Sequence, residues 1–264
     1  DRCFPLAQCV SILGTYSLLL LFTAFFLPRS SIYLGIELPE PRTSLDRPQA
    51  EFLKPLTSKP ALTITWMVLG AAMVAMWWSG WVRAWWLSER GATTEDTEQR
   101  VREKLASMRN AWMVTIGMVP IMMLALILFG APIASHVVET LSLSLLLSLL
   151  ITFAPVYTLP LPHVTIYNPP SPGRPGTTFD AASAANKLIW VRLFSELKTG
   201  LPSERFIVYP IIGVLVGAWL AAIPLALDWD RPWQAWPLLP AYGAVLGNIS
   251  GALCALIQTS LEAL

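Results

Sequence analysis

Charged residues are scarce in this 264-residue chain: Asp, Glu, Lys and Arg together make up 13% of it, whereas hydrophobic residues make up 55%. So little charge, with a mean hydropathy of +0.56, excludes one or two soluble domains. Basic residues are neither abundant nor concentrated, and the formal net charge at pH 7 is +1. We therefore expect no nucleic acid among its partners.

Residues that carry catalysis or bind metals are also few. The two histidines, His136 and His163, lie at opposite ends of one hydrophobic run, about 40 Å apart along a helix, and so do not share a metal ion. The three cysteines, Cys3, Cys9 and Cys254, are odd in number, and we expect free thiols. No metal-ligand, P-loop or nucleophile-elbow spacing is present. We therefore expect no catalytic residue, no cofactor and no metal.

What the chain does contain is long hydrophobic runs. A run of about 20 apolar residues can cross the hydrocarbon core, and it must be helical because lipid offers the backbone no hydrogen-bond partner. We predict an all-α, polytopic membrane protein in which residues 1–264 form a single transmembrane helical bundle. The six predicted spans are residues 4–27, 61–86, 111–130, 137–159, 206–227 and 237–259. The first span is expected to act as a signal anchor.

Two connecting segments also have helical patterns. Residues 89–110 place acidic residues before basic ones, which suits a helix dipole, so we expect this segment to extend the third span. In residues 180–200, Trp190, Leu193 and Phe194 recur at helical spacing with charged residues between them. This second segment is too polar to span, and we predict an amphipathic helix along the cytosolic interface. The alternative is a helix that binds a partner protein.

The distribution of Lys and Arg predicts how the bundle is oriented. The larger share of the 18 Lys and Arg residues falls on the side that also holds both termini, and the positive-inside rule places this side in the cytosol. The turn at residues 228–236 then faces the lumen or the exterior. On that same side, the proline-rich residues 28–60 are predicted to form a loop with little regular structure.

Tryptophan is concentrated near the end of the second span, around Arg83. The residues concerned are Trp77, Trp78, Trp81, Trp85 and Trp86. Because an indole ring suits the boundary between lipid and water, we interpret these residues as an aromatic belt. The alternative is a cation–π site for a cationic lipid headgroup.

Few polar side chains lie inside the spans, and each needs a partner or a function. In the sixth span, Asn248 and Gln258 need hydrogen-bond partners within a bundle. In the fourth span, Glu139 is either a proton or ion relay or an interfacial carboxylate that is solvated or paired. Together with His136 and His163, Glu139 motivates a rival hypothesis, a stand-alone lipid-modifying enzyme or a lipid transporter.

The fifth and sixth spans differ from the others in their glycines. Gly213 and Gly217 lie four residues apart in the fifth span, and Gly243, Gly247 and Gly251 repeat this spacing in the sixth. Residues four apart share one helix face, and small residues there let two backbones approach closely in lipid. Either the two helices pack on each other through these faces, or at least one face docks a helix of another protein.

The turn that joins these spans, residues 228–237, holds three tryptophans, a glutamine and three charged residues. Pro232 and Pro237 restrict its backbone, and its aspartates lie close enough to Arg231 to pair. Trp and Arg on a rigid turn are typical of hot spots in protein interfaces, and the alternative is a plain interfacial turn. The candidate partner-binding residues of this hairpin are Gly213, Gly217, Trp219, Asp228, Trp229, Asp230, Arg231, Trp233, Gln234, Trp236, Gly243, Gly247 and Gly251.

The same hairpin resembles the PIG-F family. The residues that carry the resemblance are Gly217-Ala218-Trp219, the run 223–227, the string DWDRPWQ at 228–234, Trp236-Pro237, Tyr242-Gly243-Ala244 and Gly247. The earlier spans resemble the family only in hydropathy and number.

The resemblance implies a non-catalytic, stabilising subunit of the GPI ethanolamine-phosphate transferases of the endoplasmic reticulum. Its partner in a heterodimer would be the catalytic subunit, which moves phosphoethanolamine from phosphatidylethanolamine to mannose of the GPI precursor. The chain itself would carry out no chemistry. Membrane lipids, including phosphatidylethanolamine or the GPI intermediate, are further expected partners.

Overall fold

The computed structural model describes residues 4–33, 35, 50–91, 97–132, 134–161, 178–227 and 229–263. Within these ranges the chain is predominantly helical and contains no strand, which confirms the predicted all-α fold. Among the described residues, six helices are long and apolar enough to cross a membrane. They are α1 (Leu6–Phe25), α4 (Pro60–Glu89), α5 (Thr97–Leu128), α6 (Val137–Thr158), α8 (Pro202–Ala222) and α9 (Leu238–Glu262).

The predicted spans coincide with these helices to within three residues, except at the start of α5 and at both ends of α8. Helix α5 begins at Thr97 and not at residue 111, because the charged segment before the third span continues as helix, as its charge pattern predicts. Helix α8 begins at Pro202 and not at residue 206. Proline suits the first helical position, where the missing N–H removes no intrahelical hydrogen bond. Hydropathy alone missed this first turn because it contains Glu204 and Arg205. Helix α8 ends at Ala222 and not at residue 227, because the chain continues there as a 3₁₀ helix, η3 (Ile223–Ala226).

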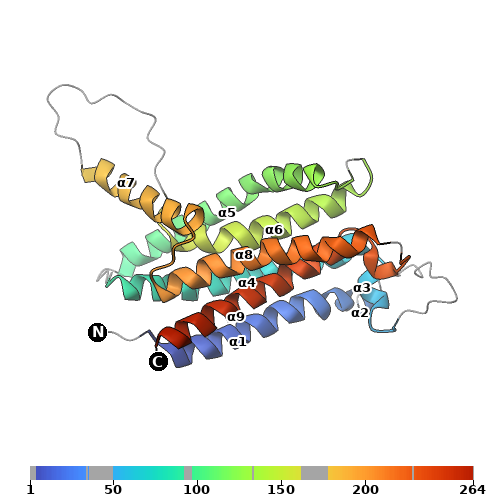
Figure 1. The fold of residues 1–264 in the computed structure, drawn as a ribbon, viewed down its shortest axis with the longest axis horizontal. Coiled ribbons are helices and arrows are strands. Elements are labelled where there is room, and N and C mark those ends of the chain that lie inside the picture. Colours follow the sequence, from blue (N-terminus) through green and yellow to red (C-terminus); the bar gives the residue numbers. More distant parts are fainter. Residues whose placement is uncertain are drawn as a thin grey trace, which may run out of the picture.

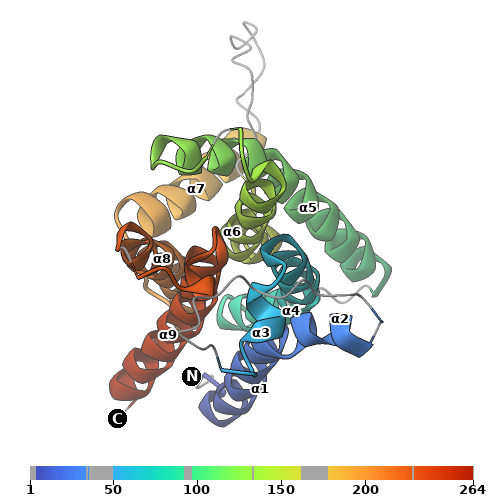
Figure 2. The same ribbon diagram turned by 90° about the vertical axis from the view of Figure 1, so that its right-hand side faces the viewer.

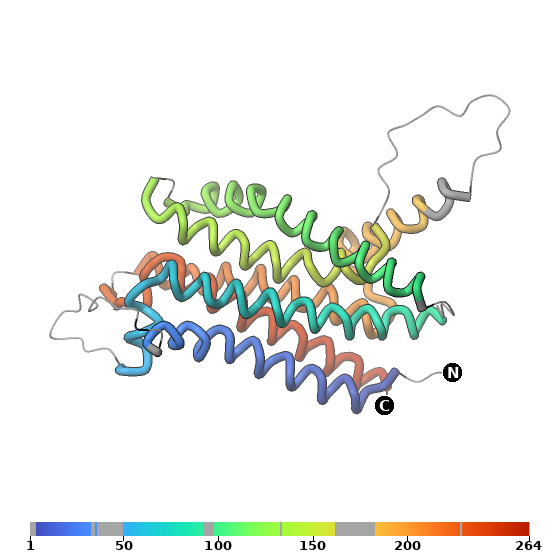
Figure 3. The backbone as a smooth tube through the Cα atoms, turned by 180° about the vertical axis from the view of Figure 1, so that it is seen from behind, coloured from blue at the N-terminus to red at the C-terminus, as the bar shows by residue number. Residues whose placement is uncertain are grey.

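The long helices are arranged around α4 and α6. Viewed down the bundle, these two lie near the middle, with α1, α5, α8 and α9 around them (Figure 2). Seen from behind, α1, α4, α6 and α5 follow one another across the molecule (Figure 3). Helices α8 and α9 form a close antiparallel pair, in which α9 also contacts α1 while α8 contacts α4 and α6. Helix α5 is peripheral: 11% of its most hydrophobic segment is buried, compared with 56% for α6.

Aromatic side chains fill the centre of the bundle. Trp78 of α4 stacks on Tyr16 of α1 with 4.2 Å between ring centroids, and it meets Phe206 of α8 edge-on at 6.2 Å. The ring of Trp85 lies 5.8 Å from that of Phe206. Trp78, Trp85 and Trp86 are all buried, so the aromatic-belt interpretation is wrong for these three residues. Trp78 and Trp85 pack in the protein core because α1 and α8 cover this face of α4.

The polar side chains predicted to need partners within the bundle have them. Asn248 of α9 is buried, and its Oδ1 accepts a hydrogen bond of 2.6 Å from the hydroxyl of Tyr16 on α1. The Oε1 of Gln258 accepts a hydrogen bond from the hydroxyl of Tyr209 on α8. These contacts join α9 to α1 and α8, and polar contacts between helices in lipid contribute about 0.6 kcal/mol each.

Both termini lie at one end of the bundle, where α7 (Thr178–Trp190) leaves it at an angle (Figure 1). This helix continues into a single π-helical turn, Val191–Ser195, and ends there and not at residue 200, because Leu197 adopts a left-handed φ of 54°. Leu193 on the apolar face is fully buried. The predicted amphipathic helix is therefore present, and its place at the cytosolic interface stays a prediction.

The opposite end of the bundle holds the connection between α1 and α4 and the turn between α8 and α9 (Figure 1). The first connection contains η1 (Leu27–Arg29), α2 (Ser30–Tyr33) and α3 (Lys54–Thr57). Predicted as an irregular loop, it thus has short helices at both of its ends, and residues 36–49 lie outside the described residues. The Oγ1 of Thr63 donates to the Leu56 carbonyl at 2.9 Å and joins α3 to α4.

Candidate partner-binding surface

The glycines of α8 and α9 face each other. A β-carbon placed on Gly213 would lie 1.9 Å from the carbonyl oxygen of Gly247, and one placed on Gly217 would lie 2.2 Å from that of Gly243. The reverse substitutions are equally crowded, with 2.0 Å from Gly247 to the Gly213 carbonyl. Gly251 meets the carbonyl of Tyr209 in the same way, at 2.2 Å. Because backbone atoms occupy these positions, no side chain can be accommodated without moving a helix.

This contact favours one of the two interpretations of the glycine faces, the packing of the hairpin on itself. The other interpretation, in which one of these faces binds a helix of another protein, is disfavoured because the two glycine faces already cover each other. The five glycines hold α8 and α9 at a fixed separation, so any effect of theirs on a partner would be indirect. That these glycines contribute to partner binding, by fixing the shape of the hairpin, stays a proposal.

The side of α8 that points away from α9 is apolar and exposed. Its large side chains are Ile212, Leu215, Val216, Trp219, Leu220 and Ile223, and we call this set the α8 outer face. Trp219 is 62% exposed and is the largest of them. Such a surface contacts either lipid tails or a helix of another protein, and an exposed tryptophan is the kind of residue that dominates an interface.

Gln234 holds together the turn between α8 and α9. This turn contains two short 3₁₀ helices, η3 (Ile223–Ala226) and η4 (Pro232–Gln234). The amide Nε2 of Gln234 donates to the carbonyls of Pro224 at 2.8 Å and Leu227 at 2.7 Å, and its Oε1 accepts from the backbone N–H of Arg231 at 2.9 Å. Each of these two carbonyls also accepts a backbone N–H, from Leu227 at 3.2 Å and from Trp229 at 2.9 Å, so the Gln234 side chain gives each a second donor.

The three tryptophans of the turn have different surroundings. Trp229 is 45% exposed, and its ring lies 5.7 Å from that of the half-buried Trp233 at 64°. Trp236 is directed into the molecule, where its Nε1 donates to the Oγ1 of Thr140 on α6 at 3.0 Å. The pair Trp229 and Trp233 is therefore accessible to a partner, whereas Trp236 anchors the turn to α6.

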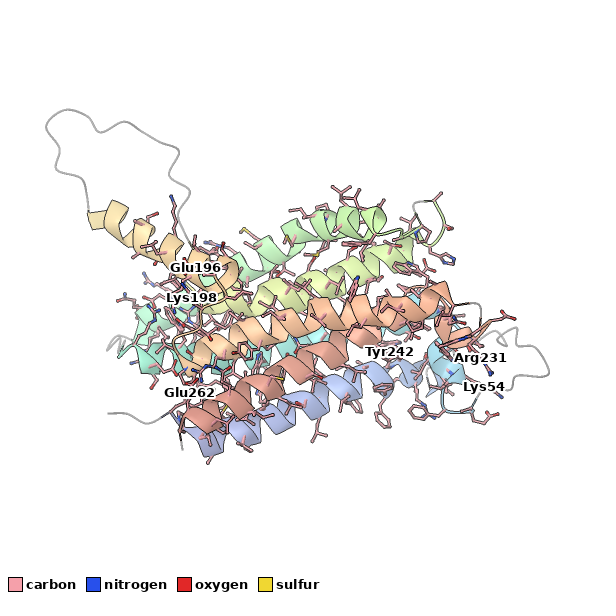
Figure 4. The ribbon with its side chains drawn as sticks, viewed as in Figure 1. Lys54, Glu196, Lys198, Arg231, Tyr242 and Glu262 are labelled. Atoms are coloured by element: carbon pink, nitrogen blue, oxygen red, sulfur yellow. The ribbon has the colours of Figure 1, made fainter. Side chains whose placement is uncertain are left out.

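The expected ion pair between Asp230 and Arg231 is not formed, and that between Asp228 and Arg231 stays a prediction. In the described part of the chain, neither Asp230 nor Arg231 takes part in an ion pair, and Asp228 lies outside the described residues. Asp230 has a left-handed φ of 48°, a conformation that aspartate tolerates better than most residues. This backbone geometry turns the chain at Asp230 and leaves the adjacent guanidinium at the same end of the bundle as Lys54 (Figure 4).

Of the three residues of the rival catalytic hypothesis, the structure brings His136 and Glu139 together. The Nδ1 of His136 lies 3.5 Å from the Oε1 of Glu139, which agrees with the paired interpretation of this carboxylate. His163 lies outside the described residues. Among the residues that the structure does describe, no group of three or more His, Cys, Asp or Glu side chains could hold a metal ion.

A buried ionic cluster at the end with the termini was missed by the sequence analysis. The carboxylate of Glu204 is fully buried, 2.5 Å from Nη2 of Arg192 and 3.6 Å from Nη2 of Arg90, and it accepts from the backbone N–H of Gly200 at 2.8 Å. These groups come from segments far apart in the chain and tie α4, α7 and α8 together. The local signal was the spacing of Pro202 and Glu204, which is typical of a helix start.

The comparisons with known proteins extend the resemblance beyond the hairpin. The model of the GPI biosynthesis protein family Pig-F matches residues 43–168 and 178–256, well over half of the chain. The glycosylphosphatidylinositol anchor biosynthesis protein 11 of Debaryomyces hansenii is 33% identical over 135 residues, which are 51% of this chain and 48% of that protein. No solved structure matches the chain.

Two further relatives show how the similarity is distributed. The human protein named GPI ethanolamine phosphate transferase, stabilizing subunit, is 33% identical over 127 residues, 47% of this chain and 46% of its own length. The anchor biosynthesis protein 11 of Yarrowia lipolytica is 59% identical over 39 residues, 15% of this chain and 18% of that protein. The chain thus matches about half the length of the first two of these curated relatives.

Proposed function

Because the chain belongs to the PIG-F family, we propose that it is a non-catalytic subunit that binds and stabilises the catalytic subunit of a GPI ethanolamine phosphate transferase. The observation that carries the proposal is the α8–α9 hairpin, which is rigid inside and apolar and exposed outside. The chain would form a heterodimer with the transferase and support the transfer of phosphoethanolamine from phosphatidylethanolamine to mannose of the GPI precursor. The similarity to the human stabilizing subunit supports this assignment.

The α8 outer face would receive a transmembrane helix of the catalytic subunit. Trp219 lies on this face beside Leu215 and Val216, and all three are exposed. A rigid hairpin loses little conformational entropy on binding, since the glycine contacts and the Gln234 hydrogen bonds already hold its shape. The accessible pair Trp229 and Trp233 would extend the contact beyond the end of α8.

Stabilisation of the partner then follows from mass action. A subunit that binds only the folded form of its partner adds about 2.7 kcal/mol to that partner's stability when its free concentration is 100 times Kd. No chemistry by this chain is required for such an effect. Loss of the subunit would lower the amount of catalytic subunit in the membrane without changing its active site.

The proposal also includes a location and an orientation. A role in GPI biosynthesis places the chain in the membrane of the endoplasmic reticulum. The Lys and Arg distribution would place both termini in the cytosol and the turn at residues 228–237 in the lumen. Phosphatidylethanolamine or the GPI intermediate would lie beside the chain while bound to the catalytic subunit.

Co-purification from detergent-solubilised membranes tests the proposal. Tagged chain is expected to recover a larger membrane enzyme, and depletion of the chain is expected to lower the amount of that enzyme and to cause GPI intermediates without phosphoethanolamine to accumulate. Trp233→Ala or Arg231→Ala should weaken recovery by about 2 kcal/mol in binding free energy if these residues are hot spots.

Lys54→Ala is the matched control for Arg231→Ala. Lys54 lies at the same end of the bundle (Figure 4), and its ion pair with Glu51 is exposed and contributes little. Recovery of the partner should be unchanged in this variant. The proposal is wrong if depletion leaves transferase levels unchanged, or if the purified chain converts a phospholipid without any other protein.

A further inference from the structure

A pocket of about 320 Å³ lies among α4, α5, α6 and α7, at the end of the bundle that holds both termini. Its polar lining includes Arg83 and Trp86 of α4, Glu103 and Asn110 of α5, Thr158 of α6 and Asn186 of α7. The last turn of α6 and the final turns of α4 contribute to it, which places it at the depth where a spanning helix meets lipid headgroups. It is separate from the α8 outer face and from the turn between α8 and α9.

Two residues of this lining each have a buried polar atom with no hydrogen-bond partner within the part of the chain that the structure describes. These atoms are the indole Nε1 of Trp86, whose side chain is 8% exposed, and the hydroxyl of Thr158, which is 2% exposed. Buried polar groups in native proteins are nearly always paired, so each such exception calls for an explanation. A ligand with hydrogen-bond acceptors, seated in the pocket, would supply the missing partners.

The cation of the pocket is held in place but not neutralised. Nη1 of Arg83 donates to the Oγ of Ser107 and to the carbonyl of Tyr157, each at 2.6 Å, so that the guanidinium joins α4, α5 and α6. No acidic side chain among the described residues forms an ion pair with Arg83. A guanidinium carries five N–H donors in a planar fork, and its free donors match the oxygens of a phosphate.

Among the described residues, the lining of the pocket includes one carboxylate, that of Glu103. Glu103 is exposed at the pocket, where its Oε1 accepts from the amide of Gln99 at 3.1 Å. Arg83 and Glu103 together make a lining of no net charge, which suits a ligand that carries a phosphate and an ammonium group. Asn110 and Asn186 add amide donors and acceptors at the same site.

We propose that this pocket binds the headgroup of a zwitterionic phospholipid, with its phosphate at Arg83, Trp86 and Thr158 and its ammonium group toward Glu103. The lipid supplies the hydrogen-bond partners that the protein lacks here and joins α5, the least buried of the long helices, to the rest of the bundle. This role is independent of the transferase partner, because the end of α6, which lines the pocket, lies at the other end of the molecule from the turn between α8 and α9 (Figure 1).

Native mass spectrometry of the full chain tests the proposal. The chain is reconstituted in vesicles with equal amounts of phosphatidylethanolamine, phosphatidylcholine and phosphatidylglycerol, released in mild detergent, and analysed for retained lipid. We expect one zwitterionic lipid to be retained in preference to phosphatidylglycerol. Arg83→Gln should reduce its retention about tenfold, the effect of losing a charged hydrogen-bond donor. Arg102→Gln on the exposed surface of α5 is the matched control and should retain lipid as the parent chain does.

Arg83 also bridges three helices, so a variant with less structural effect is needed. Thr158→Val keeps the shape of the side chain and removes only the unpartnered hydroxyl. We expect lipid retention to fall about threefold while the Tm of the lipid-free protein stays the same or rises. The control is Thr65→Val, an exposed position on α4 outside the pocket, which should leave lipid retention unchanged.

A second arm distinguishes a lipid from a soluble phosphate compound. The lipid-free chain is titrated with phosphoethanolamine and with inorganic phosphate, and the Tm is compared with that in phosphatidylethanolamine vesicles. A shift in vesicles alone supports the lipid site. Equal shifts with the soluble compounds, or equal lipid retention in Thr158→Val, Arg83→Gln and the parent chain, would overturn it.

Discussion

The two antiparallel hairpins α5–α6 and α8–α9 are similar in length and differ in how their helices meet. In α8–α9 the glycine backbones are in direct contact. A β-carbon at Gly213 would lie 1.9 Å from the carbonyl oxygen of Gly247, and one at Gly247 would lie 2.0 Å from that of Gly213. In α5–α6 large side chains meet, such as Trp112 and Phe153 with 5.1 Å between ring centroids. A backbone contact tolerates no substitution, whereas side chains can repack, so we expect α8–α9 to be the more rigid pair.

Substituting one glycine in each hairpin is the most direct test of this difference in packing. Gly247→Val should destabilise the protein by about 3 kcal/mol or more, because its side chain would overlap the Gly213 carbonyl. Gly117→Val in α5 is the matched control: nothing lies within 4 Å of a β-carbon there, and the change should stay within about 0.5 kcal/mol. Thermal unfolding in detergent measures both. Equal effects at the two positions would contradict the proposed difference.

The outward faces of the two hairpins provide the next test. Trp219→Ala on the α8 outer face should weaken binding of the catalytic subunit by about 2 kcal/mol and leave the Tm of the isolated chain within error. Leu124→Ala on α5, where the side chain is 59% exposed, should leave binding unchanged. Quantitative co-purification measures the effect. If Leu124→Ala weakens the complex more than Trp219→Ala does, then the partner docks on α5.

The turn of the α8–α9 hairpin can be loosened without touching its helices. Gln234→Leu removes the donor to two carbonyls and the acceptor for one N–H, and should lower stability by about 1.5 kcal/mol. Gln99→Leu, an exposed glutamine in α5, is the control and should have an effect near zero. Hydrogen exchange of the turn measures the loss locally. Unchanged exchange at residues 229–237 would show that other contacts hold the turn.

The smallest effect is expected at the polar contact within α5–α6. The hydroxyls of Thr115 and Thr152 lie 2.9 Å apart and are buried. A double-mutant cycle with Thr115→Val and Thr152→Val should give a coupling energy of about 0.6 kcal/mol, typical of interhelical hydrogen bonds in membranes. A coupling above that of the glycine contacts would reverse the order of rigidity proposed for the two hairpins.

Much of the candidate site was visible in the sequence because its signals are local. The glycine spacing in α8 and α9, the prolines and tryptophans of the turn, and Gln234 all lie within one continuous stretch. The contacts of these residues with other parts of the chain could not be predicted. Trp236 donates a hydrogen bond to Thr140 on α6, and Asp230, which has a left-handed φ, does not pair with Arg231 although the two are adjacent in the sequence. A contact between distant segments depends on how whole helices are placed, and no short pattern encodes that placement.

The sequence by itself determined the number of long helices and their approximate ends, because each span satisfies its own backbone hydrogen bonds and needs only sufficient length and hydropathy. Only the tertiary structure decided which face of each helix is inside: that the glycines meet each other, that Trp78 and Trp85 belong to the core, and that Trp219 faces outward. The physical reason is that lipid is as apolar as the protein interior. A membrane helix therefore need not be polar on its outer side, and its hydropathy pattern does not mark the face that packs.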